Sequence, residues 1–182
     1  MSATYNLLLA GFGGQGVLFA AKLLSYGGLI QGKEVSWLPS YGPEMRGGTA
    51  NCSVVLSDES IGSPLVTEPD VLLALNQPSY DKFEGAVVDG GLIIVDSMLV
   101  PEVTERAGVR ILKIPATTMA EEADLKGLAN VIMTGVIVKA STCLDIDNVE
   151  AAIKKSISER KAHLLEPNIR ALRLGYEYDF CK

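Results

Sequence analysis

The chain has 182 residues, of which 48% are hydrophobic and 21% charged, the balance of a globular protein long enough to bury a core. Its net charge of −6 at pH 7 argues against the basic surface that binds nucleic acid or an anionic membrane. No positively charged leader precedes the first apolar run, and that run is too short to span a bilayer. We therefore expect a cytoplasmic protein that binds neither nucleic acid nor membrane.

Cysteine and histidine, the usual ligands of transition metals, are few and scattered. Cys52, Cys143 and Cys181 form no CxxC pattern, and His163 is the only histidine. This spacing argues against a structural zinc site or an iron–sulfur cluster within the chain. We expect reduced thiols, as in the cytoplasm, no metal site and no catalytic residue.

The first elements predict a strand–helix–strand unit. Residues 5–10 (YNLLLA) form a short apolar run that ends at a glycine, which predicts a buried strand. Residues 17–29 are apolar and alanine-rich at helical spacing. Residues 34–38 (EVSWL) predict a second strand, which we expect Pro39 to end. A strand, glycine loop, helix and strand within about 30 residues are typical of the βαβ unit of a parallel sheet.

The next segment breaks this parallel pattern. Residues 40–48 (SYGPEMRGG) carry strong turn signals, and residues 49–57 (TANCSVVLS) predict a strand. Too few residues separate this strand from the preceding loop for a crossover helix to fit between them. We therefore expect it to lie antiparallel to a neighbour, which makes the sheet mixed.

The rest of the chain predicts three further strands and then helices. An acidic pair, Asp147 and Glu150, has the spacing of a capping box at the start of one helix. Together the elements predict a single domain, 1–182, of α/β class: three α/β/α layers with a mostly parallel, mixed sheet, a Rossmann-like N-terminal βαβ unit and a helical C-terminal part over about 117–175. The expected strands are 71–75, 92–95 and 109–114, and the expected helices are 78–83, 119–128, 131–141, 149–159 and 166–174.

The loop after the first strand has the composition of a phosphate cradle. Gly11, Gly13 and Gly16 match G-x-G-x-x-G, and Gly14 is an additional glycine. Such glycines allow a sharp turn, a close approach of backbone to phosphate and close packing of the helix on the sheet. The helix N-terminus then faces the anion, and Gln15 can add an amide donor. A structural glycine-rich turn is the alternative.

Other residues restrict which classes of phosphate ligand the loop could bind. A dinucleotide site normally has an acidic residue at the end of the second strand, where this chain has Leu38, Pro39 and Ser40, so NAD is disfavoured. No Gly-Lys-Ser/Thr follows the loop, which excludes a Walker motif. Ser40, Tyr41 and Arg46 place two hydroxyls and a guanidinium on the second loop, where Arg46 can bind phosphate. A surface turn with an Arg46–Glu44 pair is the alternative.

Five segments in this order resemble one protein family, the gamma subunits of 2-oxoacid:ferredoxin oxidoreductases of the 2-oxoglutarate and 2-oxoisovalerate (pyruvate/ketoisovalerate) types. The similarity extends to residues 130–135 and to the helical C-terminal part. The five segments are GFGGQG (11–16), SYGPEMRGGTANC (40–52), IGSPLV (61–66), EPDVLLALNQPSYDKF (68–83) and GGLIIVDS (90–97).

The resemblance implies a division of labour between subunits. These enzymes cleave a 2-oxoacid with thiamine diphosphate, pass electrons through iron–sulfur clusters to ferredoxin, and transfer the acyl group to coenzyme A. Thiamine diphosphate and the clusters belong to partner alpha, beta and ferredoxin-like delta subunits, and the gamma subunit helps to bind coenzyme A. The residues that the resemblance assigns to coenzyme A are Gly11, Gly13, Gly14, Gln15 and Gly16 in the first loop and Ser40, Tyr41, Arg46, Gly47 and Gly48 in the second.

Two functions of other classes remain open at this point. One is a stand-alone nucleotide-binding enzyme, and the other is a purely architectural subunit whose glycine loop has lost its ligand. Two aromatic features are also ambiguous. We expect Trp37 to lie in the core or a subunit interface, and the tail with Tyr176, Tyr178 and Phe180 to dock as a strand or against a partner.

Overall fold

The computed structural model describes residues 3–41 and 49–180. Within them, six strands form one sheet in the order β2-β3-β1-β4-β5-β6. Only β3 runs against the others: it is antiparallel to β1 and to β2, while β4, β5 and β6 continue parallel to β1. The strands are β1 (Thr4–Phe12), β2 (Glu34–Tyr41), β3 (Thr49–Ser57), β4 (Val71–Ala74), β5 (Leu92–Asp96) and β6 (Arg110–Ile114).

The position of β3 confirms the expected mixed sheet and alters the βαβ unit. β1 and β2 point the same way, as a βαβ unit requires, but β3 lies between them and pairs with both. β2 is therefore an edge strand. The prediction that Pro39 ends this strand is wrong, since β2 continues to Tyr41. Proline lacks a backbone N–H, which an edge strand tolerates because one of its sides needs no partner.

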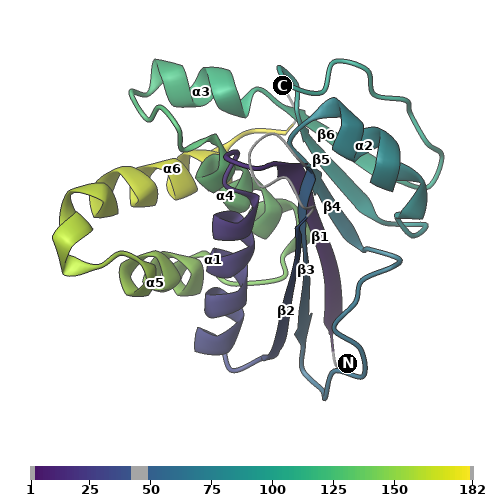
Figure 1. Ribbon diagram of the computed structural model, residues 1–182, viewed down its shortest axis with the longest axis horizontal. Helices are drawn as coiled ribbons and strands as arrows, with labels where there is room; N and C mark the ends of the chain where they lie inside the picture. The colour runs from purple at the N-terminus through teal and green to yellow at the C-terminus, as the bar shows by residue number, and fades with distance from the viewer. Residues whose placement is uncertain (1–2, 42–48, 181–182) are drawn as a thin grey trace.

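The helices cover the two faces of the sheet unequally (Figure 1). One face packs on most of the helices and holds the larger core, which includes Leu9, Leu73 and Ile94. The other face carries one short helix, where Tyr80 packs on a smaller core. The three layers are thus present, with most of the helical mass on one side. The first side holds α1 (Val17–Ile30), α3 (Ala116–Glu122), α4 (Ala129–Ser141), α5 (Ile146–Ser156) and α6 (Leu165–Glu177), and the second holds α2 (Gln77–Phe83) with the 3₁₀ turn η1 (Glu84–Ala86).

The helical C-terminal part is organised around α4, whose residues Asn130 to Val138 are all buried. α4 and α6 approach closely through two glycines. A Cβ atom at Gly135 would lie 2.7 Å from the backbone nitrogen of Tyr176, and one at Gly175 would overlap the carbonyl oxygen of Ile132. The backbones of the two helices therefore touch, which no residue with a side chain would permit at these positions.

The predicted capping box at Asp147 and Glu150 is wrong. α5 begins earlier, at Ile146, and its N-terminus has no side-chain cap. Both carboxylates instead bind Arg173 on α6, at 2.7 Å and 2.6 Å. The Arg173 guanidinium, and after it Lys154, hold the pKa of Glu150 below its usual value. Two acidic residues spaced as in a local cap thus link α5 to α6.

The aromatic tail packs on its own chain. Lys139 on α4 donates to the Tyr178 carbonyl at 2.7 Å. Two cations lie near the Phe180 ring, with the Lys139 Nζ 5.0 Å and the Arg110 guanidinium 5.7 Å from its centroid. Tyr178 and Phe180 form no strand, so the tail binds through side chains and one carbonyl. No helix of the described ranges combines the length and apolar character needed to cross a bilayer.

Candidate functional site

The glycine loop follows β1 at the carboxyl edge of the sheet. Across that edge, Gly11 on β1 pairs with Ala50 on β3, and Ala50 pairs with Tyr41 on β2. The end of β2, the start of β3 and the glycine loop thus lie side by side, so the two predicted loops share one edge. The order of the strands also reverses here: β2, which follows α1, lies on one side of β1, and β4 lies on the other side. Ligands of open α/β sheets bind at such a switch point.

Only the first two residues of the second predicted loop, Ser40 and Tyr41, lie within the described residues. Ser40 is exposed at the end of β2, and the backbone of Tyr41 pairs with Ala50. Arg46, Gly47 and Gly48, together with the side chain of Tyr41, lie outside the described residues. Their assignment to a ligand remains a prediction.

The backbone of the glycine loop suits an anion. Gly14 has φ +100° with nothing within 4 Å of its missing Cβ, so the loop faces open space there. Gly16, with φ +78°, is the N-cap residue of α1 and supplies no side-chain cap, and the first turn of α1 has no acidic residue. The first N–H groups of a helix lack partners within the helix and carry partial positive charge. The N-terminus of α1 is therefore suited to binding a negatively charged group.

The side chain of Gln15 turns inward and holds the loop. Its Oε1 accepts from the Phe12 backbone N–H at 2.6 Å and from Asn76 Nδ2 at 3.0 Å, while its Nε2 donates to the Leu75 carbonyl at 2.7 Å. Leu75 and Asn76 directly follow β4. Gln15 thus ties the glycine loop to the end of the neighbouring strand, and its amide binds protein at both ends.

Gly11 makes this arrangement possible. A Cβ there would lie 2.8 Å from Gln15 Oε1, closer than real Cβ contacts come, and only 3.2 Å from Leu75 Cβ. A larger residue would push the Gln15 amide out of its place between the two strands. The first glycine of the motif therefore makes room for protein, whereas Gly14 faces the open side.

Two asparagines outside the glycine motif, to which the sequence pattern gave no role, complete the support of the loop. Asn130, at the start of α4 and buried, donates to the Gly16 carbonyl at 3.1 Å. Asn76 holds Gln15 and also caps α2 by accepting from the Ser79 N–H at 2.9 Å. A polar residue at the head of an otherwise apolar helix was the available signal for Asn130, but its partner lies 114 residues away in the sequence.

A shallow, mainly apolar hollow of about 230 Å³ adjoins the open side of the loop. It runs from the glycines to the first turns of α1 and the start of β3. Larger hollows of about 240 and 440 Å³ occur elsewhere, so volume alone does not identify a ligand site. The backbone donors at the start of α1 favour the hollow beside the loop. The residues that line this hollow are Phe12, Gly13, Gly14, Gly16, Val17, Leu18, Phe19 and Ala50.

Comparison with known proteins identifies the family. Residues 6–178 match the family described as pyruvate ferredoxin/flavodoxin oxidoreductase. The chain belongs to this family. The resemblance drawn from the five sequence segments is thereby confirmed.

Relatives within the family differ in length. The ketoisovalerate oxidoreductase subunit VorA of Methanothermobacter thermautotrophicus is 42% identical over 171 residues, which are 93% of this chain and 35% of VorA. The 2-oxoglutarate synthase subunit KorC of Methanocaldococcus jannaschii is 39% identical over 179 residues, which are 94% of this chain and 92% of KorC. The chain thus spans about a third of VorA and nearly all of KorC.

Solved structures share the fold. The gamma subunit of a keto/oxoacid ferredoxin oxidoreductase from Geobacter sulfurreducens superposes with a TM-score of 0.81 at 28% identity and covers 95% of this chain and 96% of its own. The 2-oxoglutarate:ferredoxin oxidoreductase of Magnetococcus marinus gives 0.84 at 20% identity and covers 94% of this chain and 30% of its own. The mixed sheet is thus the architecture of both.

The two thiols within the described residues are unsuited to nucleophilic chemistry. Cys52 and Cys143 are buried, and burial raises their pKa values to about 12 and about 11. Over residues 3–41 and 49–180, no group of three His, Cys, Asp or Glu side chains is placed to hold a metal ion. Among the described residues, the backbone donors at the start of α1 are suited to binding an anion.

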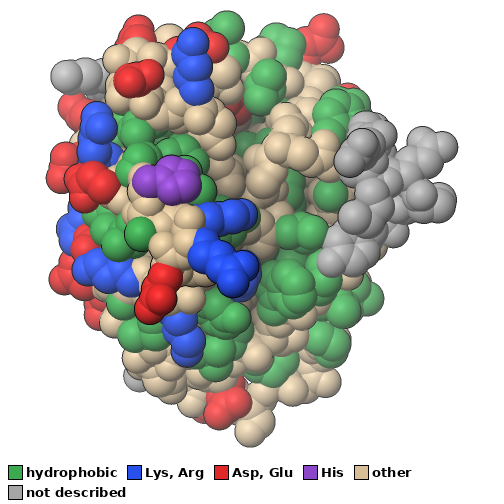
Figure 2. All heavy atoms as spheres, turned by 60° about the vertical axis from the view of Figure 1, so that its left-hand side comes forward, with side chains coloured by type: hydrophobic (Ala, Val, Ile, Leu, Met, Phe, Trp, Pro, Cys, Tyr) green, Lys and Arg blue, Asp and Glu red, His purple; other side chains and the backbone are tan. Residues whose placement is uncertain are grey.

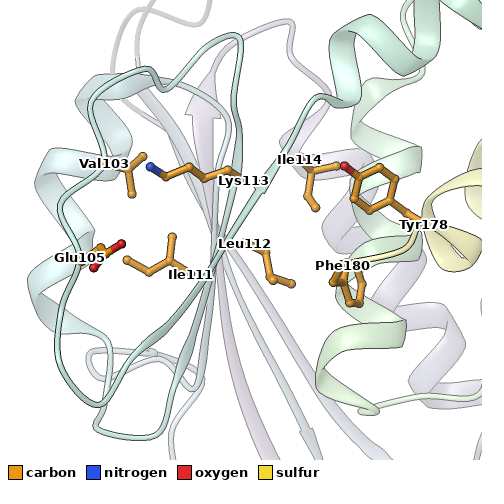
Figure 3. Close-up of a pocket in the computed structure, with 8 residues that line it drawn as sticks. All are labelled: Val103, Glu105, Ile111, Leu112, Lys113, Ile114, Tyr178 and Phe180. Atoms are coloured by element: carbon orange, nitrogen blue, oxygen red, sulfur yellow. The ribbon is translucent and has the colours of Figure 1, made fainter. Parts of the chain in front are cut away.

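A second hollow lies along β6, at the opposite edge of the sheet from β2 (Figure 3). Tyr178 and Phe180 from the tail line one side, and Val103 and Glu105 line the other, with Lys113 between them on the strand. Its lining residues include no glycine and none from the first turn of a helix, where an anion would bind. In this family member the glycine loop therefore remains the better ligand site.

Proposed function

We propose that this chain is the gamma subunit of a multi-subunit 2-oxoacid:ferredoxin oxidoreductase and that its glycine loop binds coenzyme A. One observation carries the ligand assignment: the open loop at Gly14 leads directly into the uncapped N-terminus of α1. Phosphate groups bind at helix N-termini that glycine leaves accessible. The family membership and the subunit names of the relatives support the rest.

The phosphates of coenzyme A would lie on the backbone of Gly13, Gly14 and Gly16. Gln15 would support the loop without contacting the phosphates, since its backbone N–H already binds the Phe12 carbonyl at 3.2 Å and its side chain is held by the protein. Ser40 and Tyr41 approach from β2, and Arg46 supplies positive charge, with Gly47 and Gly48 permitting close approach. A guanidinium matters here because the chain carries a net charge of −6.

Coenzyme A is preferred over other phosphate compounds for two reasons. The last residues of β2, Leu38 to Tyr41, include no acidic side chain, although a dinucleotide site normally has one at this place. The Magnetococcus marinus enzyme, which shares the fold, was solved with 2-oxoglutarate, coenzyme A and succinyl-CoA bound. The apolar hollow beside the loop offers a surface for the uncharged part of such a ligand.

Catalysis would take place on other chains. In this proposal, alpha and beta subunits and a ferredoxin-like delta subunit hold thiamine diphosphate and the iron–sulfur clusters, and electrons leave to ferredoxin in the cytoplasm. The gamma subunit, a single domain over 1–182, contributes coenzyme A binding and assembly. This division agrees with the buried, unreactive thiols of the described residues.

A pair of variants that differ only in charge tests the ligand. Gly14→Asp and Gly14→Asn place side chains of equal size in the same open space, and both face the same backbone strain. If phosphate lies on the loop, the Asp variant should raise the coenzyme A KM of the reconstituted complex at least tenfold over the Asn variant, because a carboxylate repels the anion. Equal KM values would contradict the assignment.

Two measurements separate the competing functions. A purely architectural subunit predicts normal assembly but no protection of the glycine loop from hydrogen exchange when coenzyme A is added. A stand-alone enzyme predicts turnover by this chain in the absence of other subunits. Under our proposal the loop is protected, and the chain alone does not turn over a 2-oxoacid.

A further inference from the structure

A second surface lies further along α1 and is unlike the glycine loop. A hollow of about 220 Å³ between α1 and β2, here called the Trp37 groove, is lined by Lys22, Ser25, Tyr26, Leu29, Val35 and Trp37. Trp37 is 42% exposed and Leu29 54% exposed. Figure 2 brings the helical side of the molecule forward and shows hydrophobic side chains gathered on it, with Lys and Arg side chains beside them. Large apolar side chains exposed together mark an interaction site.

The groove exists because β2 is the edge of the sheet. Within the described residues β2 pairs with β3 alone, so its outer side presents unpaired backbone groups. Leu38, next to Trp37 in the strand, is 37% exposed and points to the opposite face. Apolar side chains are therefore uncovered on both faces of the same free edge.

The floor of the groove is closely packed. Gly28 lets α1 lie close to the sheet: a Cβ there would be 2.7 Å from Leu56 Cδ2 and 2.9 Å from Val35 Cγ2. The helix thus cannot settle further over Trp37, and the hollow between them is part of the fold. Its surface is preformed for a partner, as at most recognition sites.

The rim of the groove is positively charged. Lys22 on α1 and Lys155 on α5 both lie over the Tyr26 ring, with their Nζ atoms 5.3 Å and 5.5 Å from its centroid. Among the described residues neither lysine has a carboxylate at ion-pair distance. Although the chain has a net charge of −6, these two cations beside an apolar groove complement an acidic partner.

We propose that the Trp37 groove is the docking site for a segment of a partner subunit, which inserts an apolar side chain between Tyr26 and Trp37 and places carboxylates against Lys22 and Lys155. The partner's identity as another subunit of the oxidoreductase rests on the proposed function. The relatives support the need for such a surface. The matching region is about a third of the longer VorA chain and nearly all of the subunit KorC, so in both arrangements it meets further polypeptide.

The sole tryptophan of the chain gives a direct test. The chain labelled with 5-fluorotryptophan has one fluorine resonance, from Trp37, which can be followed while unlabelled partner subunits of the oxidoreductase, purified without this chain, are added. Docking should shift that resonance to saturation as the groove closes over the ring. Resistance of the Trp37 signal to a soluble paramagnetic quencher should rise in parallel.

Charge reversal supplies the matched variants. Lys155→Glu should weaken assembly at least tenfold, because the ammonium that faces the partner's carboxylate becomes repulsive. Lys161→Glu makes the same change at an exposed lysine outside the groove and should leave assembly within twofold. For the apolar part, Trp37→Glu should prevent assembly, whereas Met98→Glu, at a residue 61% exposed on another surface, should not.

The outcomes separate this inference from the proposed function. Normal assembly with an unchanged fluorine resonance and no effect of Lys155→Glu would overturn the docking site and leave the proposed function standing. Failure of this chain to assemble with the partner subunits would overturn both. A resonance that moves with the concentration of this chain alone, with dimers in sedimentation, would assign the groove to a second copy. A saturable shift on adding ADP alone would assign it to a small anionic ligand. Either result overturns the proposal.

Discussion

Gly14 and Gly16 have similar backbone conformations and very different surroundings. Both have positive φ, but a Cβ at Gly14 would meet nothing within 4 Å, while one at Gly16 would lie 2.7 Å from Asn130 Cγ. Asn130 occupies that space because it donates to the Gly16 carbonyl. Gly14 therefore leaves the loop accessible from the open side, whereas Gly16 makes room for the contact with α4.

This difference predicts unequal effects of two alanine substitutions. Gly14→Ala should cost about 1–2 kcal/mol through backbone strain alone. Gly16→Ala has the same strain and must also displace Asn130, which adds about 1–3 kcal/mol for a lost buried hydrogen bond. Thermal unfolding followed by circular dichroism measures both. The second mutation Asn130→Ala should cost less in the Gly16→Ala background than in the wild type. Equal melting temperatures of the two glycine variants would contradict this interpretation.

At the scale of elements, the contact between α4 and α6 depends on two glycines in different helices. Gly135 lies in the middle of α4, where glycine is a poor helix former, and Gly175 lies in the last turn of α6. Each is buried against the backbone of the other helix. The intrinsic cost of glycine is offset by close helix packing, which brings Lys139 of α4 within reach of the tail.

Gly175→Ala should therefore be strongly destabilising although alanine favours helices. The methyl group would overlap the Ile132 carbonyl, and the two backbones would have to move apart at a cost of about 3 kcal/mol or more. Gly85→Ala, where a Cβ meets open space, is the control and should change the unfolding free energy by less than about 1 kcal/mol. Urea unfolding compares the two. A Gly175→Ala protein as stable as the control variant would show that the helices are not in backbone contact.

On the scale of the whole molecule, two cysteines report on the core. Cys52 on β3 and Cys143 after α4 are almost completely buried in the same cluster, although they lie far apart in the sequence. Burial raises the pKa of each thiol, to about 12 and about 11. The thiolate is the reactive form, so both protection from reagent and a low thiolate population suppress reaction at pH 8.

Thiol labelling should consequently follow global unfolding. In a Cys181→Ser variant, which removes the third thiol, Ellman's reagent at pH 8 should label neither remaining cysteine in the native protein except through rare unfolding. The labelling rate should increase with urea along the unfolding transition seen by circular dichroism. Rapid labelling of one thiol without denaturant would show that its part of the core opens independently.

Local sequence patterns were sufficient for most elements. Apolar runs of strand length predicted β1, β4, β5 and β6, because such runs must be buried and glycine or proline ends them. The short connection before β3 correctly predicted an antiparallel strand. The pattern could not show that β3 lies between β1 and β2, or that Pro39 is therefore in an edge strand. Strand order depends on long-range pairing, which residue spacing does not encode.

The candidate site divides in the same way. The sequence by itself determined the glycine loop, its position between a strand and a helix, and the family, because these depend on neighbouring residues and on ordered motifs. Only the tertiary structure decided that Gln15 faces Leu75 and Asn76, that Asn130 binds Gly16, and that Trp37 is exposed in a groove shared with Lys22. Those contacts join residues far apart in the chain, and hydrogen bonding and burial assign each side chain its role only after the sheet and helices have assembled.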